Sequence, residues 1–179
     1  MSVNIIRVYL SLGSNLGDRN NNLDTALSLI SHIPGVKLVD VSEFMETEPW
    51  GFSSSHKFLN CAASIDYNPT ETKKEVCNTE QRLSDNVEEK ESICLLNALK
   101  NIEWVMGRRE NVKFNSEGKR IYHSRLIDID ILLYGTKTIR TDILTVPHPL
   151  MKERDFVMRP LLQIADNNIK SSFPDIFGK

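Results

Sequence analysis

The sequence predicts an α+β domain, with a mainly antiparallel sheet and helices packed on its face. Three observations favour this class. Some segments alternate apolar and polar residues, as half-buried strands do, and others repeat apolar residues every three or four positions, as helices do. These segments follow one another in the order strand, helix, strand, strand, helix, strand. With 179 residues, 40% of them hydrophobic, the chain can build one full core, so we expect a single domain over 1–179.

The N-terminal part of the chain predicts a strand, a helix and a second strand. Apolar residues alternate from Ile6 to Leu12, and this strand ends in the turn-rich segment 13–18. A helix follows, because apolar residues recur at helical spacing. They are Leu23, Ala26, Leu27 and Ile30. The pair Pro34-Gly35 ends this pattern before a strand over 37–44.

A third strand is predicted over 57–65, after a loop at 46–55, and its two faces differ in character. One face carries Leu59, Cys61, Ala63 and Ile65, and the other carries Phe58, Asn60 and Ala62. We expect the first face to pack in the core and the second to offer groups for binding.

Residues 70–108 have a mostly helical pattern. The pattern divides around the charged segment 83–91, which fits either two helices or one helix with an insertion. We expect the charge-rich region 71–93 to form a helical extension of the domain.

The C-terminal part adds a strand ending at Tyr134, a hairpin turn at 134–137 into 138–141, and short helical pieces around 151–165. The complete order resembles the ferredoxin-like, split β-α-β arrangement. Helices would then cover one face of the sheet, and ligand chemistry would belong on the opposite face.

The segment from Arg125 to Tyr134 places two carboxylates in an otherwise apolar, β-branched run, where an unpaired charge would be costly to bury. Successive side chains of a strand point to opposite faces, so Asp128 and Asp130 share one face with Cβ atoms about 6.5 to 7 Å apart. A divalent cation fits between them, and magnesium is usually held by one or two carboxylates with substrate phosphates and water. The alternative is a solvated sheet face on which the aspartates pair with Lys or Arg.

A basic segment precedes these aspartates. Between Gly107 and Arg125, six basic residues stand against two acidic ones, although the net charge of the chain is −2. The basic residues are Arg108, Arg109, Lys113, Lys119, Arg120 and Arg125. Arginine forks bind phosphate oxygens bidentately, so this segment beside an acidic strand suits a polyphosphate with its cation. A solvated surface loop is the alternative.

Composition argues against several other classes. The N-terminus lacks a signal-peptide pattern and no run approaches the roughly 18 apolar residues of a membrane span, so we expect a cytoplasmic protein. Cys61, Cys77 and Cys94 are odd in number and widely spaced, which argues against a disulfide framework or zinc site and predicts reduced thiols. The slightly negative charge and the lack of an aromatic-rich RNA-binding signature argue against an RNA-binding module.

Seven short motifs follow one another along residues 5–165. They are Gly13-Ser-Asn-Leu-Gly17, Thr47-Glu-Pro-Trp-Gly51, Phe58-Leu-Asn60, Gly107-Arg108, Arg125-x-x-Asp-x-Asp130, Val146-Pro-His-Pro149 and Arg154-x-Phe156. Their order and spacing resemble those of the 6-hydroxymethyl-7,8-dihydropterin pyrophosphokinase family. A pair of aspartates alone also occurs in other transferases, so the set of seven motifs carries the resemblance.

The resemblance implies transfer of an intact diphosphate from ATP to the hydroxymethyl group of a reduced pterin, giving AMP and a pterin diphosphate for folate synthesis. It implies two Mg²⁺ ions held with ATP by Asp128 and Asp130, and catalytic roles for Arg108 and Arg125. The implied ATP-binding set is Arg108, Tyr122, Arg125, His148 and Arg154. Two alternatives stay open: Arg108 could complement a helix dipole, and His148 could be a turn residue.

For the pterin, the resemblance implies stacking on Phe58 and Phe156 and pairing with Asn60. The implied loop wall consists of Thr47, Pro49 and Trp50. A flat bicycle with donors and acceptors along its edge needs aromatic faces and carboxamide partners, which fits this set. Ordinary core packing is the alternative for the two phenylalanines. We assign no chemistry to Asn15 and interpret it as a backbone-capping residue.

The chain departs from the family pattern in two places. Tyr122-His-Ser124 stands where many members have Trp-Gly-Pro, and the region 71–93 is longer than in compact members. Nothing resembles an appended dihydropteroate synthase or aldolase domain, so we expect a single-function enzyme, a monomer or weak homodimer that binds neither nucleic acid nor membrane. The rival enzyme is another magnesium-dependent nucleotidyl or phosphoryl transferase with a different acceptor.

Overall fold

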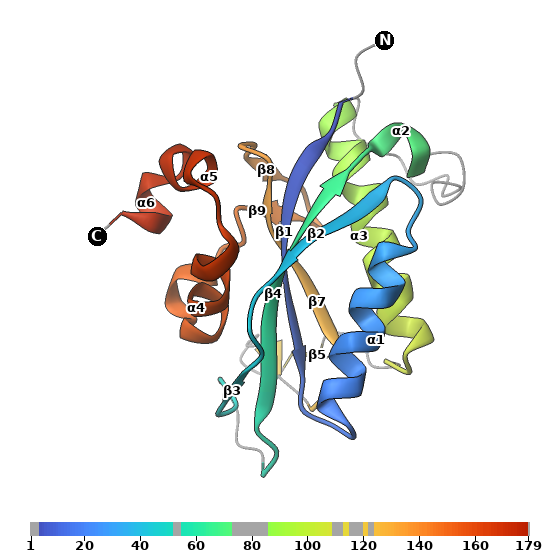
Figure 1. The fold of residues 1–179 in the computed structure, drawn as a ribbon, viewed down its shortest axis with the longest axis vertical. Coiled ribbons are helices and arrows are strands. Elements are labelled where there is room, and N and C mark those ends of the chain that lie inside the picture. Colours follow the sequence, from blue (N-terminus) through green and yellow to red (C-terminus); the bar gives the residue numbers. More distant parts are fainter. Residues whose placement is uncertain are drawn as a thin grey trace.

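The centre of the fold is a five-stranded sheet built around two long, paired strands, β1 (Ile6–Ser14) and β4 (Phe58–Tyr67) (Figure 1). The computed structural model describes residues 4–51, 55–72, 86–108, 113–114, 120–121 and 124–178. The strand order is β2-β4-β1-β7, with β2 (Val36–Val41), β7 (Asp128–Tyr134) and a short β3 (Met45–Thr47) beside β4. Every neighbouring pair in this sheet is antiparallel, which confirms the predicted mainly antiparallel sheet.

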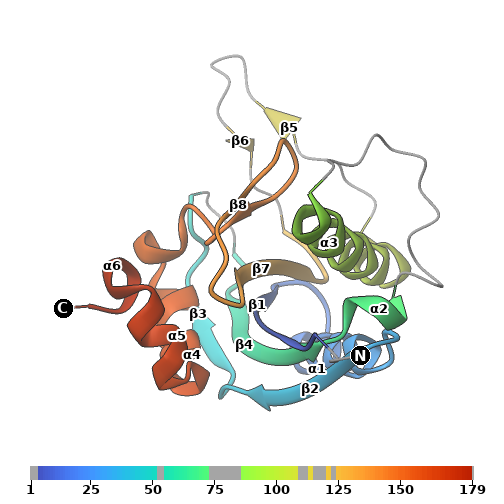
Figure 2. The same cartoon turned by 90° about the horizontal axis from the view of Figure 1, so that it is seen from above.

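Two helices, α1 (Arg19–Ser31) and α3 (Val87–Val105), cover one face of the sheet (Figures 1 and 2). The buried residues of α1 are the four that its periodicity predicted. Helix α1 begins at Asp18, whose side chain accepts a hydrogen bond from Asn21 N at 3.0 Å, a regular N-cap. Burial of an aliphatic side chain contributes about 1.5 to 3 kcal/mol, so this layer holds both helices on the sheet. Among the helices of the described ranges, none combines the length and apolarity needed to cross a membrane.

The opposite face is also covered along part of its length, which corrects the expectation of helices on one face only. The covering elements are η1 (Met151–Glu153), α4 (Asp155–Ile164), α5 (Asn167–Ser172) and α6 (Pro174–Phe177) (Figure 1). They pack on Tyr9, Ala62 and Leu132, because the sheet is apolar at this end of the face. Further along the same strands the face becomes polar and carries a pocket.

The predicted hairpin after β7 is wrong. Strand β8 (Ile139–Arg140) pairs with β9 (Thr145–Val146) in a separate ladder and does not return along β7. The outer edge of β7 is instead used by His148, whose N–H donates to Leu132 O at 3.0 Å. The loop expected at 46–55 also contributes, at its start, to β3.

The predicted helical pattern at 70–108 gives the short helix α2 (Pro69–Thr72) and α3. Residues 73–85, most of the expected extension at 71–93, lie outside the described residues. In the basic segment, β5 (Lys113–Phe114) pairs with β6 (Arg120–Ile121).

The cysteines differ from one another. Cys61 is a free thiol in the core, and burial, together with the charge of Asp24, raises its pKa to about 12. Cys94, on α3, is disulfide-bonded, so the expectation of reduced thiols is wrong for this residue. Cys77 lies outside the described residues.

A contact between Tyr9 and Asp166 ties the C-terminal helices to the central strand. Tyr9 Oη donates to Asp166 Oδ2 at 2.9 Å, and Asp166 also caps α5 by accepting from Ile169 N at 2.8 Å. Burial raises the pKa of Asp166, but these hydrogen bonds and the charge of Arg7 outweigh it and hold the pKa below its usual value. The contact therefore stabilises the fold above the ordinary carboxyl pKa of about 3.9 and is lost only as the pH falls through the lowered value.

Replacing Tyr9 by Phe should lower the free energy of unfolding by about 1 kcal/mol at pH 7, because the hydrogen bond to the carboxylate is lost. Urea denaturation measures this change. In an Asp166→Asn background, which keeps a capping side chain but removes the charge, Tyr9→Phe should cost less. Equal costs in the two backgrounds would contradict the assignment.

Candidate active site

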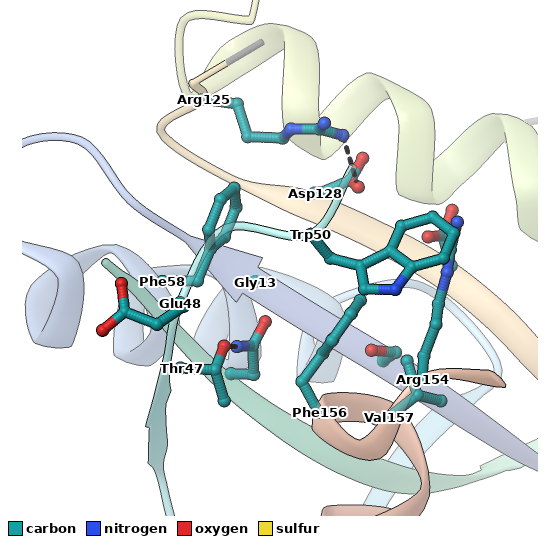
Figure 3. Close-up of a pocket in the computed structure, with 13 residues that line it drawn as sticks. Gly13, Thr47, Glu48, Trp50, Phe58, Arg125, Asp128, Arg154, Phe156 and Val157 are labelled. Atoms are coloured by element: carbon teal, nitrogen blue, oxygen red, sulfur yellow. Dashed lines mark hydrogen bonds and ion pairs between the residues drawn. The ribbon is translucent and has the colours of Figure 1, made fainter. Parts of the chain in front are cut away.

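The pocket lies where the antiparallel register brings polar side chains of three strands into two rows. In one row Gly13 of β1 lies opposite Asn60 of β4 and opposite Asp128 of β7. In the next row Ser11 lies opposite Asp130. Because the central strand contributes only small residues here, the carboxamide and the two carboxylates line one pocket. Figure 3 shows Gly13 and Asp128 of these rows.

The pocket joins two sets of residues that the family resemblance assigned to two different substrates, the pterin and ATP with its metal. The lining includes Thr47, Trp50, Phe58, Asn60 and Phe156 from the predicted pterin set and Arg125, Asp128, Asp130 and Arg154 from the predicted ATP and metal sets. It also includes Glu48 and Val157, which sequence reasoning did not single out. Pro49 is the residue between two lining residues of the same loop.

Two other predicted residues, Arg108 and His148, lie outside the lining of this pocket. Arg108 contacts Asp128 from beside the pocket. His148 lies along the outer edge of β7, and its Nδ1 accepts a hydrogen bond from Leu150 N at 3.3 Å, a contact typical of a turn. Tyr122 lies outside the described residues.

Two arginines flank Asp128. Arg125 Nη1 lies 2.6 Å from Asp128 Oδ2, and Arg108 Nη1 pairs with Oδ1. Burial raises the pKa of this carboxyl, but the charges of Arg125, Lys100 and Arg108 outweigh it and hold the pKa below its usual value. The carboxylate is therefore ionised, although its side chain is only 21% exposed. In the structure, Asp128 is thus paired with arginine side chains, as in the alternative that the sequence left open beside a cation site.

Asp130 has a different environment. Its carboxylate lines the pocket, and within the described part of the chain no side chain is hydrogen-bonded to it. In the same part of the chain, no cluster of three or more His, Cys, Asp or Glu side chains could hold a metal on its own. The donor set is thus two carboxylates on one sheet face, which suits a hard cation whose other ligands come from a phosphate or water.

The end of α3 sets the position of Arg108. Gly107 has φ +104°, and its N–H donates to Trp104 O at 3.0 Å, while Arg108 N donates to Glu103 O at 2.9 Å. These two bonds form a Schellman motif, which favours glycine at the left-handed position. A side chain at this glycine would also meet Leu126, at 3.1 Å. The Gly107-Arg108 motif therefore ends the helix and directs the arginine to the edge of β7.

Asn15 sets the position of Arg125. Its Oδ1 accepts from Arg125 N at 2.7 Å, and its Nδ2 donates to Ser124 Oγ at 3.0 Å. Its own N–H donates to Arg125 O at 3.1 Å. The interpretation as a backbone-capping residue is confirmed, but the backbone that Asn15 holds is 110 residues away in sequence. Sequence reasoning missed this partner, because the turn motif alone does not identify it.

The aromatic side of the pocket is built around Arg154, which is only 7% exposed. Its Cζ lies 4.6 Å from the ring centroid of Trp50 and 5.8 Å from that of Phe156, in the range of cation–π contacts. Figure 3 shows these three side chains on one side of the pocket and Phe58 on the other. A flat ring could lie between the two sides.

Asn60 lies at the floor of this space and is 3% exposed. Its Nδ2 donates to Thr47 Oγ1 at 2.8 Å, which fixes the plane of the carboxamide. A Cβ on Gly13 would lie 2.8 Å from Asn60 Oδ1, closer than real contacts allow. The glycine therefore makes room for the carboxamide.

Comparison with known proteins places the chain in a family. Its residues 9–93 and 86–166 match the family model described as 7,8-dihydro-6-hydroxymethylpterin-pyrophosphokinase (HPPK). The chain is 39% identical over 159 residues to the 2-amino-4-hydroxy-6-hydroxymethyldihydropteridine pyrophosphokinase of Porphyromonas gingivalis, covering 88% of this chain and 90% of that protein. It is 34% identical over 159 residues to the enzyme of the same name from Bacillus subtilis, covering 88% and 77%.

Some similar proteins are longer. The folic acid synthesis protein fol1 of Schizosaccharomyces pombe is 36% identical over 157 residues, but the chain spans only 18% of it. A crystal structure of an HPPK-DHPS protein in complex with substrates shares the fold, with a TM-score of 0.57 at 15% identity. That match covers 96% of this chain and 43% of the other.

Together with the family match, the fold and pocket define a protein of the nucleotide-dependent transferase class. More specifically, the chain belongs to the HPPK family. It is an ATP-dependent pyrophosphokinase of folate biosynthesis.

Replacing Gly13 by Ala should weaken binding of the reduced pterin by about 10-fold, because the new methyl group displaces the Asn60 carboxamide from its place beside Thr47. Titration calorimetry with the pterin measures the effect. The backbone at Gly13 does not have a positive φ, but the displaced carboxamide loses its hydrogen bond to Thr47, so the melting temperature should fall by a few degrees. Unchanged pterin affinity would contradict this account of the pocket floor.

Proposed function

We propose that the two halves of this pocket bind the two substrates, with the pterin ring on the aromatic side and the triphosphate of ATP beside the aspartates. The observation that carries the proposal is the row of Asn60, Gly13 and Asp128 across three strands. In this row a carboxamide suited to a pterin edge and a carboxylate suited to a metal-bound phosphate are separated by a single glycine. A substrate hydroxyl that projects from the ring would then reach the phosphate site directly.

Pterin recognition rests on the carboxamide and the aromatic rings. Asn60 is held by Thr47 and can in addition donate a second N–H and accept at Oδ1. A buried amide left unpaired costs about 1 to 3 kcal/mol, so ring analogues that lack the matching edge should be rejected. Offset stacking on Phe58 and Phe156 would add about 0.5 to 1.5 kcal/mol beyond burial.

The charged residues bear on the phosphoryl chemistry. In the proposed reaction the pterin hydroxyl oxygen bonds to the β-phosphorus of ATP, the bond from this phosphorus to the oxygen of the α-phosphate breaks, and AMP leaves. The hydroxyl proton is released in the same process. Arg108 and Arg125 would stabilise the negative charge that develops on the phosphate oxygens. In the structure, ion pairs with Asp128 hold both guanidinium groups beside β7.

Magnesium fits the donor set. Asp128 and Asp130 would hold the cations, two in our proposal, together with the phosphates. When bound, such ions neutralise phosphate charge and polarise the reacting phosphorus. Arg108 and Arg125, which neutralise Asp128 in the structure, would then be released toward the phosphates.

The remaining assignments are also proposals. Arg154 and His148 would contact the nucleotide, and we keep Tyr122 in the same set. The strand order β2-β4-β1-β7 with antiparallel pairing supports a ferredoxin-like topology. We further propose a single-domain cytoplasmic enzyme that acts as a monomer or weak homodimer.

Phosphorus NMR of the chain with ATP, magnesium and hydroxymethyl dihydropterin should show AMP and a pterin diphosphate as the only products. Release of ADP or of free diphosphate would overturn the proposal in favour of another phosphoryl or nucleotidyl transferase. The NMR signals distinguish these outcomes without any assumption about rate.

Asp128→Ala should lower kcat by about 100-fold or more, because the cation site and the anchor of both arginines are lost, while pterin affinity changes little. Asn60→Ala should act in the opposite way and mainly raise the KM for the pterin. Steady-state kinetics over a range of magnesium concentrations separate the two effects. Asp142→Ala, an exposed aspartate outside the pocket, is the matched control. Normal kcat for Asp128→Ala would refute the metal assignment.

A further inference from the structure

We propose that Glu103, on α3, is a positioning residue that holds Arg108 beside the aspartate strand while this arginine exchanges Asp128 for a phosphate of the nucleotide. The inference rests on the proposed phosphate-binding role of Arg108. Glu103 does not line the pocket and was not among the residues that the sequence singled out.

The contacts of Glu103 join three parts of the site. Its Oε2 lies 2.8 Å from Arg108 Nη1. Its Oε1 accepts from the backbone N–H of Ile129 at 2.7 Å and from Lys100 Nζ at 2.9 Å. Ile129 is the residue between Asp128 and Asp130, so one carboxylate connects the arginine directly to the backbone that carries both aspartates.

Arg108 is attached to Glu103 twice. Besides the side-chain ion pair, the N–H of Arg108 donates to the Glu103 carbonyl in the Schellman motif that ends α3. Glu103 therefore holds both the backbone N–H and the guanidinium of Arg108. This double attachment restricts the guanidinium to a small region beside β7.

The charge arrangement explains why a second carboxylate is needed. Nη1 of Arg108 pairs with both Glu103 and Asp128, and an NH₂ group of a guanidinium can donate two hydrogen bonds. If Asp128 turns to a cation, the arginine loses one of these partners. Glu103, which is 2% exposed and has its other oxygen fixed by Ile129 and Lys100, stays as the second partner. The guanidinium is then preorganised for a phosphate and need not be reordered from solvent.

Glu103→Gln tests the proposal because it keeps an acceptor for Ile129 N but removes the charge that holds the arginine. We expect kcat to fall by about 10- to 100-fold, the range for loss of a hydrogen bond to a charged group, with the KM for the pterin unchanged. Glu88→Gln is the matched control, since Glu88 lies on the same helix in an exposed ion pair with Lys137, away from the pocket. Its kcat should equal that of the unaltered chain.

A double-mutant cycle separates positioning from a purely structural role. If Glu103 acts through Arg108, Glu103→Gln should lower the kcat of the otherwise unaltered chain. The same substitution should have little further effect on the kcat of the Arg108→Ala variant. Equal losses in both backgrounds, or no loss in the first, would overturn the proposal. Failure of the proposed function would appear separately, as the absence of AMP formation by the unaltered chain.

Discussion

The pocket depends on the register of β1 between β4 and β7. Because side chains on neighbouring strands meet in rows, the identity of the residue in the central strand decides what its two neighbours can do. Gly13 contributes no side chain to the row that contains Asn60 and Asp128. A register shift of one residue would place Leu12 between Asn60 and Asp128, and its side chain would cover this row. The pocket therefore depends on the pairing of these strands as much as on the side chains that line it.

Electrostatic balance around β7 is the second constraint. Asp128 and Glu103 are carboxylates of low exposure, and Arg108 is shared between them while Arg125 serves Asp128. Burying any of these charges alone would be strongly unfavourable. As a set they are mutually compensated, which lets the protein keep a dense group of charges beside a sheet core. Under the proposed function, the same set would offer a phosphate two guanidinium groups that are already oriented.

The sequence predicted those parts of the site that follow from local periodicity. The alternation of a strand placed Asp128 and Asp130 on one face and Phe58 with Asn60 on one face, and the structure has both sets in the pocket. The covered second face was missed, because the pieces around 151–165 are short and their apolar residues reveal no partner by themselves. The roles of Asn15 and Glu103 were also missed. Asn15 is bonded to Arg125, 110 residues away, and Glu103 joins the nearby Arg108 to Ile129, 26 residues away; only tertiary packing brings these strands and loops together.

Helix α4 belongs both to the pocket and to the C-terminal layer. Phe156 and Val157 line the pocket, and Val157 also packs with Leu161 in the cluster that anchors the layer to Tyr9. The pocket and the packing of the C-terminal layer therefore share the side chain of Val157. A ligand that packs on Phe156 also contacts the helix that carries Leu161, so ligand binding and the packing of the C-terminal layer on the sheet would stabilise one another.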